Sequence, residues 1–289
     1  MAAQLLTEPM AIDLVQSITR QAIMTALQPD PIATAYVHRG SGGQPIVLLH
    51  GFDSSVLEFR RLLPQLAEHH QTWAIDLLGF GFTERPPTLA YTPAAIKTHL
   101  HATWQTLIGQ PIVLVGASMG GAVAIDFALT YPEAVAQLVL LDSAGFAAGP
   151  AIGRFLIPPL GYLATEFLRQ TPVRRQVSFS AYVDPSLVTP DAELCGALHL
   201  QTPGWRSALI AFTQSGGYNF LHDRIADLAR PTLIVWGDSD KILGIQDAAK
   251  FHAAIAHSQL VWVKNCGHVP HLEKPQETAA AILQFVQQG

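Results

Sequence analysis

Short runs of hydrophobic residues alternate along the chain with longer amphipathic segments, and this alternation predicts an α/β protein. The runs that predict strands are 33–38, 45–50, 72–77, 111–116, 136–142, 231–240 and 259–264. The segments that predict helices are 56–69, 93–108, 119–131, 246–256 and 276–287. Because the runs are rich in Val, Ile and Leu with no alternating polar positions, they indicate a sheet buried on both faces, and hence a parallel one.

The alternation stops after Asp142 and resumes at residue 231. Residues 146–222 contain proline, glycine and helix-like apolar segments but no clear buried strand. We therefore predict an α/β core formed by residues 33–145 and 223–289, with a helical cap of residues 146–222 inserted into it.

The N-terminal part, residues 1–32, has a different pattern. Residues 10–27 place apolar side chains near helical spacing and are followed by Pro29, which predicts an amphipathic helix. Such a helix either packs on its own domain or contacts a membrane surface or another subunit. The first ten residues lack a basic region and a continuous apolar core, and no run of 18 apolar residues occurs. We expect a protein that is not secreted and is cytoplasmic or peripherally membrane-associated.

The composition and net charge of the chain indicate which kinds of partner and metal site to expect. Hydrophobic residues make up 49% of the chain and charged residues 13%, which indicates a folded globular protein. The net charge is −5 and the 17 Lys and Arg residues form no basic block, so nucleic acid is not an expected partner. Two cysteines, Cys195 and Cys266, are too few for a disulfide framework or a zinc site, and we expect two separate thiols.

The sequence Gly-Ala-Ser-Met-Gly at 116–120 joins a predicted strand to a predicted helix. A tight turn of this kind holds its central residue in a strained conformation and projects the side chain above the sheet. Gly116 and Gly120 supply the small residues that are needed where strand and helix nearly touch, and Gly121 lets the helix pack closely. Ser118 is therefore the candidate nucleophile, and it requires a base and a site for an oxyanion.

Candidates for the base and its supporting acid follow the last predicted strands. His268 is the predicted base, whereas His271 is expected to stabilise the loop or line the pocket. Asp240 is the predicted acid, which would fix the imidazole tautomer and stabilise the imidazolium. Asp238 is expected to hold the turn. Asp142 is a second candidate for the acid, although we expect it to cap a strand end.

Two backbone N–H groups are expected to hold the oxyanion. Met119 follows the serine at a helix start, where the helix dipole favours negative charge. Phe52, in the sequence HGFDSS after an earlier strand, is expected to supply the second donor. His50 has a structural role in this interpretation, and Asp53 and Ser54 are expected to cap the following helix.

An ordered set of these residues resembles the α/β-hydrolase family: His50, Gly51, Phe52, Gly116–Gly120, Asp240, Gly267 and His268. The resemblance implies an eight-stranded, mostly parallel sheet with helices on both faces and a helical cap after the sixth strand. It also implies hydrolysis without a metal or organic cofactor. Dehalogenases and soluble epoxide hydrolases of the family carry aspartate at the nucleophile position, and Ser118 excludes their alkyl-ester chemistry.

The cap indicates the substrate class. Residues 146–168 contain only Arg154 and Glu166 as charges, which favours a lipophilic acyl or alcohol group. The stretches HGFDSSVLEFR, WAIDLLGFGF and AFTQSGGYNF are similar to plastid and cyanobacterial members of the family, among them chlorophyll dephytylases. That similarity implies hydrolysis of a phytyl ester at the thylakoid surface, with the apolar cap and the N-terminal helix in peripheral contact with the membrane.

The predicted reaction is ester hydrolysis through an acyl-enzyme on Ser118. One alternative is a carbon–carbon bond hydrolase of the meta-cleavage type, which shares the Gly-X-Ser-Met-Gly turn. Its substrates carry a carboxylate that requires a pocket arginine, and the candidates are Arg154, Arg174, Arg175 and Arg206. A second alternative is a small-molecule receptor that keeps the hydrolase fold with little turnover. The complete set of Ser118, Asp240 and His268 weighs against a receptor.

Overall fold

A computed structural model describes residues 2–146 and 160–288. Eight strands form one sheet in the order β1-β2-β4-β3-β5-β6-β7-β8. The strands are β1 (Thr19–Thr25), β2 (Gln28–Arg39), β3 (Ile46–Leu49), β4 (Thr72–Ile75), β5 (Ile112–Ala117), β6 (Val135–Leu141), β7 (Thr232–Gly237) and β8 (Ser258–Val263). Only β2 runs antiparallel to its neighbours β1 and β4. The predicted mostly parallel sheet of eight strands is confirmed.

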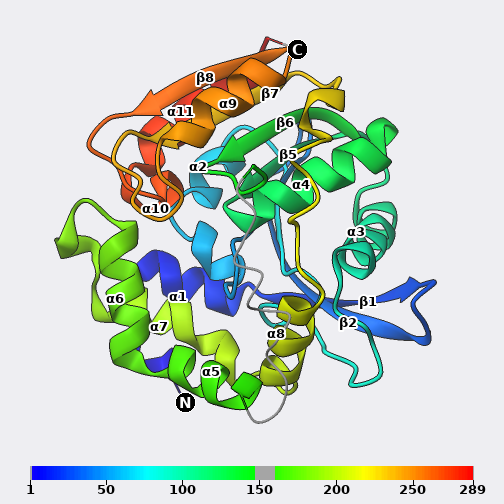
Figure 1. Cartoon of the computed structure of the whole chain (residues 1–289), viewed down its shortest axis with the longest axis vertical. Helices are drawn as coiled ribbons and strands as arrows, with labels where there is room; N and C mark the ends of the chain where they lie inside the picture. Colours follow the sequence, from blue (N-terminus) through cyan, green and yellow to red (C-terminus); the bar gives the residue numbers. More distant parts are fainter. Residues whose placement is uncertain (1, 147–159, 289) are drawn as a thin grey trace.

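Helices cover both faces of this sheet (Figure 1). The helices of the core are α1 (Pro9–Gln16), α2 (Leu63–Ala67), α3 (Pro93–Leu107), α4 (Met119–Thr130), α9 (Gln246–Ala254), α10 (Pro270–Glu273) and α11 (Pro275–Val286). On β3, Val47 and Leu49 join the apolar cluster that contains α3, α4 and α9, whereas Ile46 and Leu48 join the cluster that contains α1, α2 and α11. Alternate side chains of a strand point to opposite faces, so every position of β3 is buried.

The predicted N-terminal helix is wrong beyond Gln16. Helix α1 ends there, and residues 19–25 form β1, which pairs antiparallel with β2. Ile23 is the buried residue of this strand and lies opposite Ile32. The apolar residues of this segment have helical spacing, but the backbone hydrogen bonds that β2 offers decide that the segment forms a strand. Residues 1–32 are therefore not a separate helical segment, because the β1–β2 hairpin belongs to the sheet.

The helix predicted over 56–69 is also broken. Val56–Phe59 forms a 3₁₀ turn, and α2 covers only Leu63–Ala67. Pro64 has no N–H to donate into a continuing helix, but it fits the first turn of a new one.

In the described part of the chain between β6 and β7, helices follow the sixth strand where the cap is predicted. These helices are α5 (Leu160–Arg169), α6 (Thr171–Ala181), α7 (Pro190–Ala197) and α8 (Trp205–Gln214). Figure 1 shows them gathered at one end of the molecule, away from α9 and α11. Arg154 and most of the apolar segment singled out at 146–168 lie outside the described residues. No helix within the described ranges is long and apolar enough to cross a membrane.

A buried histidine between α3 and β2 makes stability depend on pH. His99 Nε2 lies 2.7 Å from Thr34 Oγ1, and burial lowers the pKa of His99 to about 4. In the unfolded chain the pKa returns to about 6.5, so the unfolded state binds the extra proton as pH falls. The stabilisation is complete above pH 6.5 and is lost as pH falls towards 4.

We expect His99→Gln to remove about one proton from the pH dependence of unfolding between pH 6.5 and 4. The wild-type free energy of unfolding should fall in this range by up to about 3 kcal/mol more than that of the variant. Urea unfolding at several pH values measures the difference. Parallel curves for the two proteins would contradict the assignment.

Candidate active site

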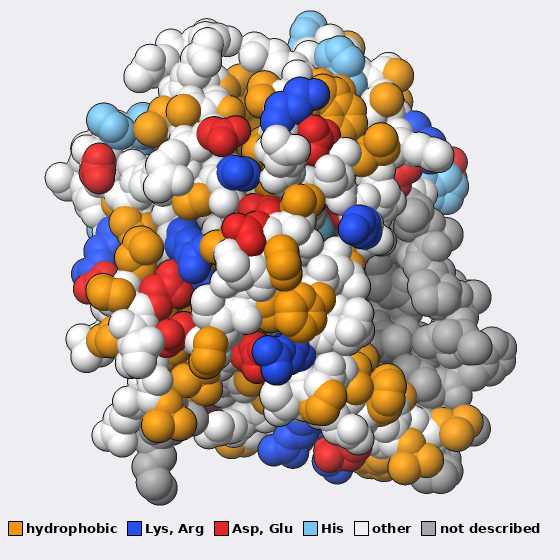
Figure 2. All heavy atoms as spheres, turned by 90° about the vertical axis from the view of Figure 1, so that its left-hand side faces the viewer, with side chains coloured by type: hydrophobic (Ala, Val, Ile, Leu, Met, Phe, Trp, Pro, Cys, Tyr) orange, Lys and Arg blue, Asp and Glu red, His pale blue; other side chains and the backbone are white. Residues whose placement is uncertain are grey.

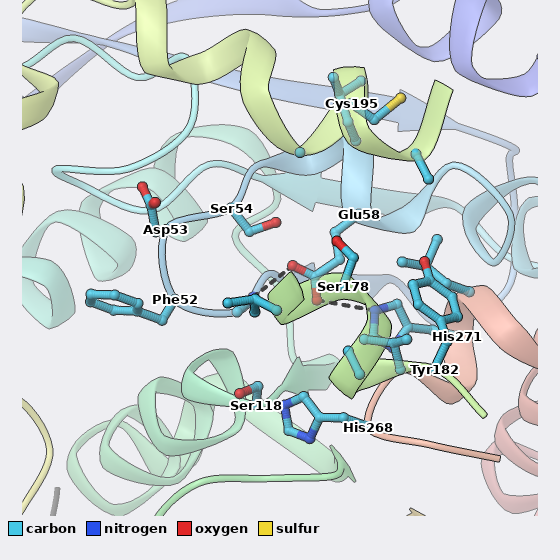
Figure 3. A pocket seen from close by; sticks show the side chains of 18 of the residues that line it. Phe52, Asp53, Ser54, Glu58, Ser118, Ser178, Tyr182, Cys195, His268 and His271 are labelled. Carbon is cyan, nitrogen blue, oxygen red and sulfur yellow. Dashed lines mark hydrogen bonds and ion pairs between the residues drawn. The ribbon is translucent and has the colours of Figure 1, made fainter. Parts of the chain in front are cut away.

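Ser118 occupies the turn between β5 and α4 in a strained conformation. Its φ is 51° and its ψ is −118°, a left-handed backbone that costs a non-glycine residue about 1–3 kcal/mol. The Ser118 N–H donates to Leu141 O at 3.0 Å, and the Ser118 carbonyl accepts from Gly121 N at 3.0 Å. This geometry turns the side chain away from the sheet and into a cavity under the cap (Figure 3).

The two glycines that flank the serine are required by close backbone contacts. A Cβ atom on Gly116 would lie 2.2 Å from Gly120 O, and one on Gly120 would lie 2.1 Å from Leu49 O. A Cβ on Gly121 would similarly meet Ser143 Oγ at 2.1 Å. Strand and helix can therefore approach closely enough to form the turn only with glycine at these positions.

Substitution of Gly120 tests this steric requirement. We expect Gly120→Ala to lower the free energy of unfolding by about 3 kcal/mol or more, because backbone atoms must move to admit the methyl group. The matched control is Gly196→Ala in α7, where a Cβ would meet nothing within 4 Å. Chemical unfolding should place the control within about 1 kcal/mol of wild type. Equal stabilities for the two variants would refute the steric argument.

His268 and Asp240 lie together beside this turn. His268 Nδ1 is 3.0 Å from Asp240 Oδ2, and Asp240 Oδ1 accepts from Ile242 N at 2.7 Å and Leu243 N at 3.2 Å. Burial raises the pKa of Asp240, but the contact with His268 and the two backbone donors outweigh it and leave the pKa below its usual value. Figure 3 shows the His268 ring next to the Ser118 hydroxyl. The structure thus brings together the three residues that the sequence singled out.

Asp142, the second candidate acid, lies behind this pair. One ligand atom each of Asp142, Asp240 and His268 fall within 4.8 Å of one another. Burial and the neighbouring Asp240 raise the pKa of Asp142 well above its usual value, and its Oδ1 accepts from Gly237 N at 3.1 Å. The raised pKa of Asp142 favours its protonated form, whereas the lowered pKa of Asp240 favours the charged carboxylate that contacts the imidazole.

The loop that follows β3 brings Phe52 to the cavity. A Cβ on Gly51 would lie 3.4 Å from Ser118 Cβ, so this loop packs directly on the serine. The Gly51 N–H is occupied because it donates to Glu58 Oε2 at 3.0 Å. Met119 is the first residue of α4, as expected. The N–H groups of Phe52 and Met119 thus remain the candidate oxyanion donors.

His50 has the structural role expected of it. Its Nδ1 lies 2.8 Å from Gly51 O, and its Nε2 accepts from Leu77 N at 3.1 Å. Complete burial lowers the pKa of His50 to about 4, so the ring is neutral and its tautomer is set by these two contacts.

Asp53 does not cap the following helix; the side chain of Ser55 does. Asp53 instead connects the loop to the cap, because Oδ2 accepts from Arg174 Nη1 at 2.7 Å and Oδ1 accepts from Trp205 Nε1 at 2.7 Å. His199 Nε2 lies 3.2 Å from the same Oδ1. These partners come 121 to 152 residues later in the chain, and no local sequence signal pairs them with Asp53.

Two adjoining cavities lie between the core and the cap. The first has a volume of about 330 Å³ and is lined by Ser118 and His268. The second, of about 260 Å³, lies against α5, α6 and α7 and shares Phe52, Arg174 and Val177 with the first. The second cavity thus adjoins the first on the side of the cap helices.

A sheet of this order, with a serine turn after β5 and a cap after β6, defines the α/β-hydrolase class. The family model for the alpha/beta hydrolase fold matches residues 44–275, and the chain belongs to this family. It is 37% identical to the alpha/beta hydrolase domain-containing protein VTE7 of Arabidopsis thaliana over 83% of this chain and 73% of that protein.

Two bacterial enzymes are further relatives. The 2-hydroxy-6-oxo-6-(2'-aminophenyl)hexa-2,4-dienoic acid hydrolase of Metapseudomonas resinovorans is 31% identical over 88% of each chain. Lipase 1 of Psychrobacter immobilis is 30% identical over 84% of this chain and 77% of the lipase. The comparisons thus show a hydrolase, and the relatives include one named as a dienoic acid hydrolase and one named as a lipase.

Proposed function

We propose that the protein is a serine hydrolase that cleaves a carboxylic ester with a lipophilic group through an acyl-enzyme. The observation that carries this proposal is the strained turn that presents Ser118 beside His268, whose Nδ1 lies 3.0 Å from a charged Asp240. A serine hydroxyl becomes a nucleophile when an oriented base accepts its proton.

The proposed reaction has two halves. Ser118 Oγ attacks the ester carbonyl and its proton passes to His268 Nε2, while the N–H groups of Phe52 and Met119 hold the oxyanion. His268 then protonates the leaving alcohol, which gives the acyl-enzyme. In the second half His268 takes a proton from water, and the hydroxide releases the acid from Ser118. Asp240 keeps the imidazole in the required tautomer throughout and holds its charge.

A lipophilic group is supported by the second cavity and by the lipase relative. Leu168, Val173 and Val177 line this cavity on the side of the cap. A hydrocarbon chain placed there leaves water for an apolar surface. The sequence similarity to plastid and cyanobacterial members makes a phytyl-type ester the finer proposal for this chain.

The outer face of α5 supports a peripheral contact with a membrane. Leu160, Leu163 and Phe167 follow helical spacing and are 56%, 64% and 58% exposed. On the face drawn in Figure 2, apolar side chains are interspersed with charged ones and do not form one continuous patch. Helix α1 turns Ala11 and Leu14 inwards. We therefore assign the proposed contact to α5 and not to the N-terminal helix.

A series of esters tests the substrate class. We expect kcat/KM to rise from acetyl and short alkyl esters to long-chain and phytyl-type esters, by about threefold to fourfold for each CH₂ that becomes buried. Steady-state assays in detergent below its critical concentration measure this trend. A preference for acetyl esters would refute the lipophilic class and leave the serine mechanism standing.

The carbon–carbon bond hydrolase is the second candidate, and the relative from Metapseudomonas favours it. Its carboxylate substrate needs an arginine; the three described candidates from the sequence are paired, Arg174 with Asp53, Arg175 with Glu193 and Arg206 with Glu166, whereas Arg60, which the sequence did not single out, lines the cavity beside Ser118. Turnover of a dienoate without turnover of simple esters would favour this candidate. Rapid multiple turnover of an ester would eliminate the receptor alternative.

A further inference from the structure

The cavity beside Ser118 has a polar end that the proposed reaction does not use. Arg60, Glu58, Tyr182 and His271 line it, and each of these side chains is buried or nearly so. Figure 3 places His271 and Tyr182 on the side of the cavity opposite Phe52. The second cavity adjoins this one at Phe52 and Val177, and its lining on the side of the cap includes Leu168 and Val173 as well as charged side chains.

Two nitrogen atoms at this end lack a partner within the described part of the chain. Arg60 Nε donates to Glu8 Oε2 at 3.0 Å and Nη1 donates to Leu57 O at 3.4 Å; the guanidinium also interacts with the Tyr182 hydroxyl, but Nη2 makes no hydrogen bond of good geometry. His271 Nε2 lies 3.0 Å from Glu58 Oε1, while His271 Nδ1 also makes none. A buried donor without an acceptor costs about 1–3 kcal/mol, and more when it is charged.

The charged groups at this end leave the Arg60 guanidinium with an incompletely compensated positive charge. Glu8 is shared between Arg60 and Arg61, at 3.0 and 2.9 Å, so one carboxylate faces two guanidinium groups. Burial lowers the pKa of Arg60, yet its neighbours raise it above the usual value, so the group stays charged. Burial raises the pKa of Cys195, the nearby thiol, to about 11, so no thiolate compensates that charge.

We propose that Arg60 and His271 form a subsite for a second oxygen acceptor of the substrate, a carbonyl or carboxylate oxygen on the half of the ester opposite its lipophilic group. The substrate class is then an ester with a hydrocarbon chain on one side of the scissile bond and an oxygen-bearing group on the other. This inference rests on the proposed ester hydrolysis for the orientation of the two halves about Ser118.

Binding to the Ser118→Ala protein tests the subsite without turnover. The probes are matched pairs: octyl 4-oxopentanoate against octyl pentanoate, and 4-oxopentyl octanoate against pentyl octanoate. Octyl hemisuccinate separates recognition of a carboxylate from recognition of a neutral carbonyl. Calorimetric titration gives Kd for each probe, and we expect about tenfold tighter binding of the oxygen-bearing member of at least one pair.

The variants are Arg60→Met and Arg61→Met, each made in the Ser118→Ala protein. Both remove a guanidinium that pairs with Glu8, but only Arg60 lines the cavity. The Kd ratio is the Kd of the probe without the extra oxygen divided by the Kd of its oxygen-bearing partner. We expect this ratio to fall towards one in Arg60→Met and to stay unchanged in Arg61→Met. If the Arg60 variant does not fold, His271→Gln replaces it, since an amide can still face Glu58 while the Nδ1 position is lost.

Two results would overturn the subsite. One is a Kd ratio near one for every probe in the Ser118→Ala protein. The other is an equal loss of the ratio in the Arg60 and Arg61 variants. Turnover of the same esters by the wild-type protein is measured separately. Absence of turnover with a retained Kd ratio would refute the proposed function and not the subsite.

Discussion

Replacing Ser118 with alanine is expected to lower kcat for a chromogenic ester by about 10⁴-fold to 10⁶-fold, with the fold intact. The methyl group keeps the strained turn and the packing of its glycines, but it removes the atom that forms the acyl-enzyme. Residual activity would come from the oxyanion donors and from binding alone. Steady-state kinetics measure kcat, and pre-steady-state kinetics measure the burst of released alcohol that accompanies formation of the acyl-enzyme. In the variant this burst should disappear.

A fluorophosphonate probe provides the matching chemical test. We expect it to label the peptide that contains Ser118 in the wild-type protein, and to label neither Ser118→Ala nor His268→Ala at a comparable rate. Ser207→Ala is the control, because Ser207 is exposed on α8 and only donates to Gly204 O. Unchanged turnover in Ser118→Ala, or labelling at another serine, would refute the mechanism.

The second large effect is expected for Asp240→Asn, which should lower kcat by about 10⁴-fold. Asparagine keeps the acceptor for the Ile242 and Leu243 N–H groups but presents an NH₂ group to His268 Nδ1. The imidazole then carries its proton on Nε2 and cannot accept one from Ser118. A pH profile of kcat would show the same loss at every pH at which the enzyme folds.

Asp142→Asn is the control that separates the two carboxyl groups. Burial and the neighbouring Asp240 raise the pKa of Asp142 and so favour its protonated form, and an amide would reproduce both a donor to Asp240 and the acceptor for Gly237 N. We expect less than about a tenfold change in kcat. A loss as large as that of Asp240→Asn would mean that Asp142 supplies the charge.

Local pattern was sufficient for much of the core. The strands β3 to β7 follow from their apolar runs, because a strand buried on both faces needs apolar residues at nearly every position, whereas β8 lies at the edge of the sheet and buries fully only Val263. The Ser118 turn could be predicted from the sequence because its steric requirement is local. The two glycines whose backbones touch, Gly116 and Gly120, are four residues apart. The order of the nucleophile, acid and base is likewise a property of the chain.

The N-terminal hairpin shows where local pattern failed. Residues 19–25 have helical spacing of apolar side chains, but β2 offers hydrogen bonds along the whole segment, with Thr19 opposite Tyr36. A backbone partner of this kind is visible only once the sheet forms. The tertiary structure therefore decided the type of element here.

By itself the sequence determined the fold class, the nucleophile turn with Ser118, and the acid and base that accompany it, because each depends on neighbours along the chain or on an ordered pattern of short motifs. The tertiary structure decided that the pKa of Asp240 is lowered while that of Asp142 is raised, that Asp53 joins the loop to the cap, and that Arg60 keeps an unpartnered nitrogen. Charge state and hydrogen-bond satisfaction depend on burial and on groups distant in sequence, and these are set only when the chain is folded.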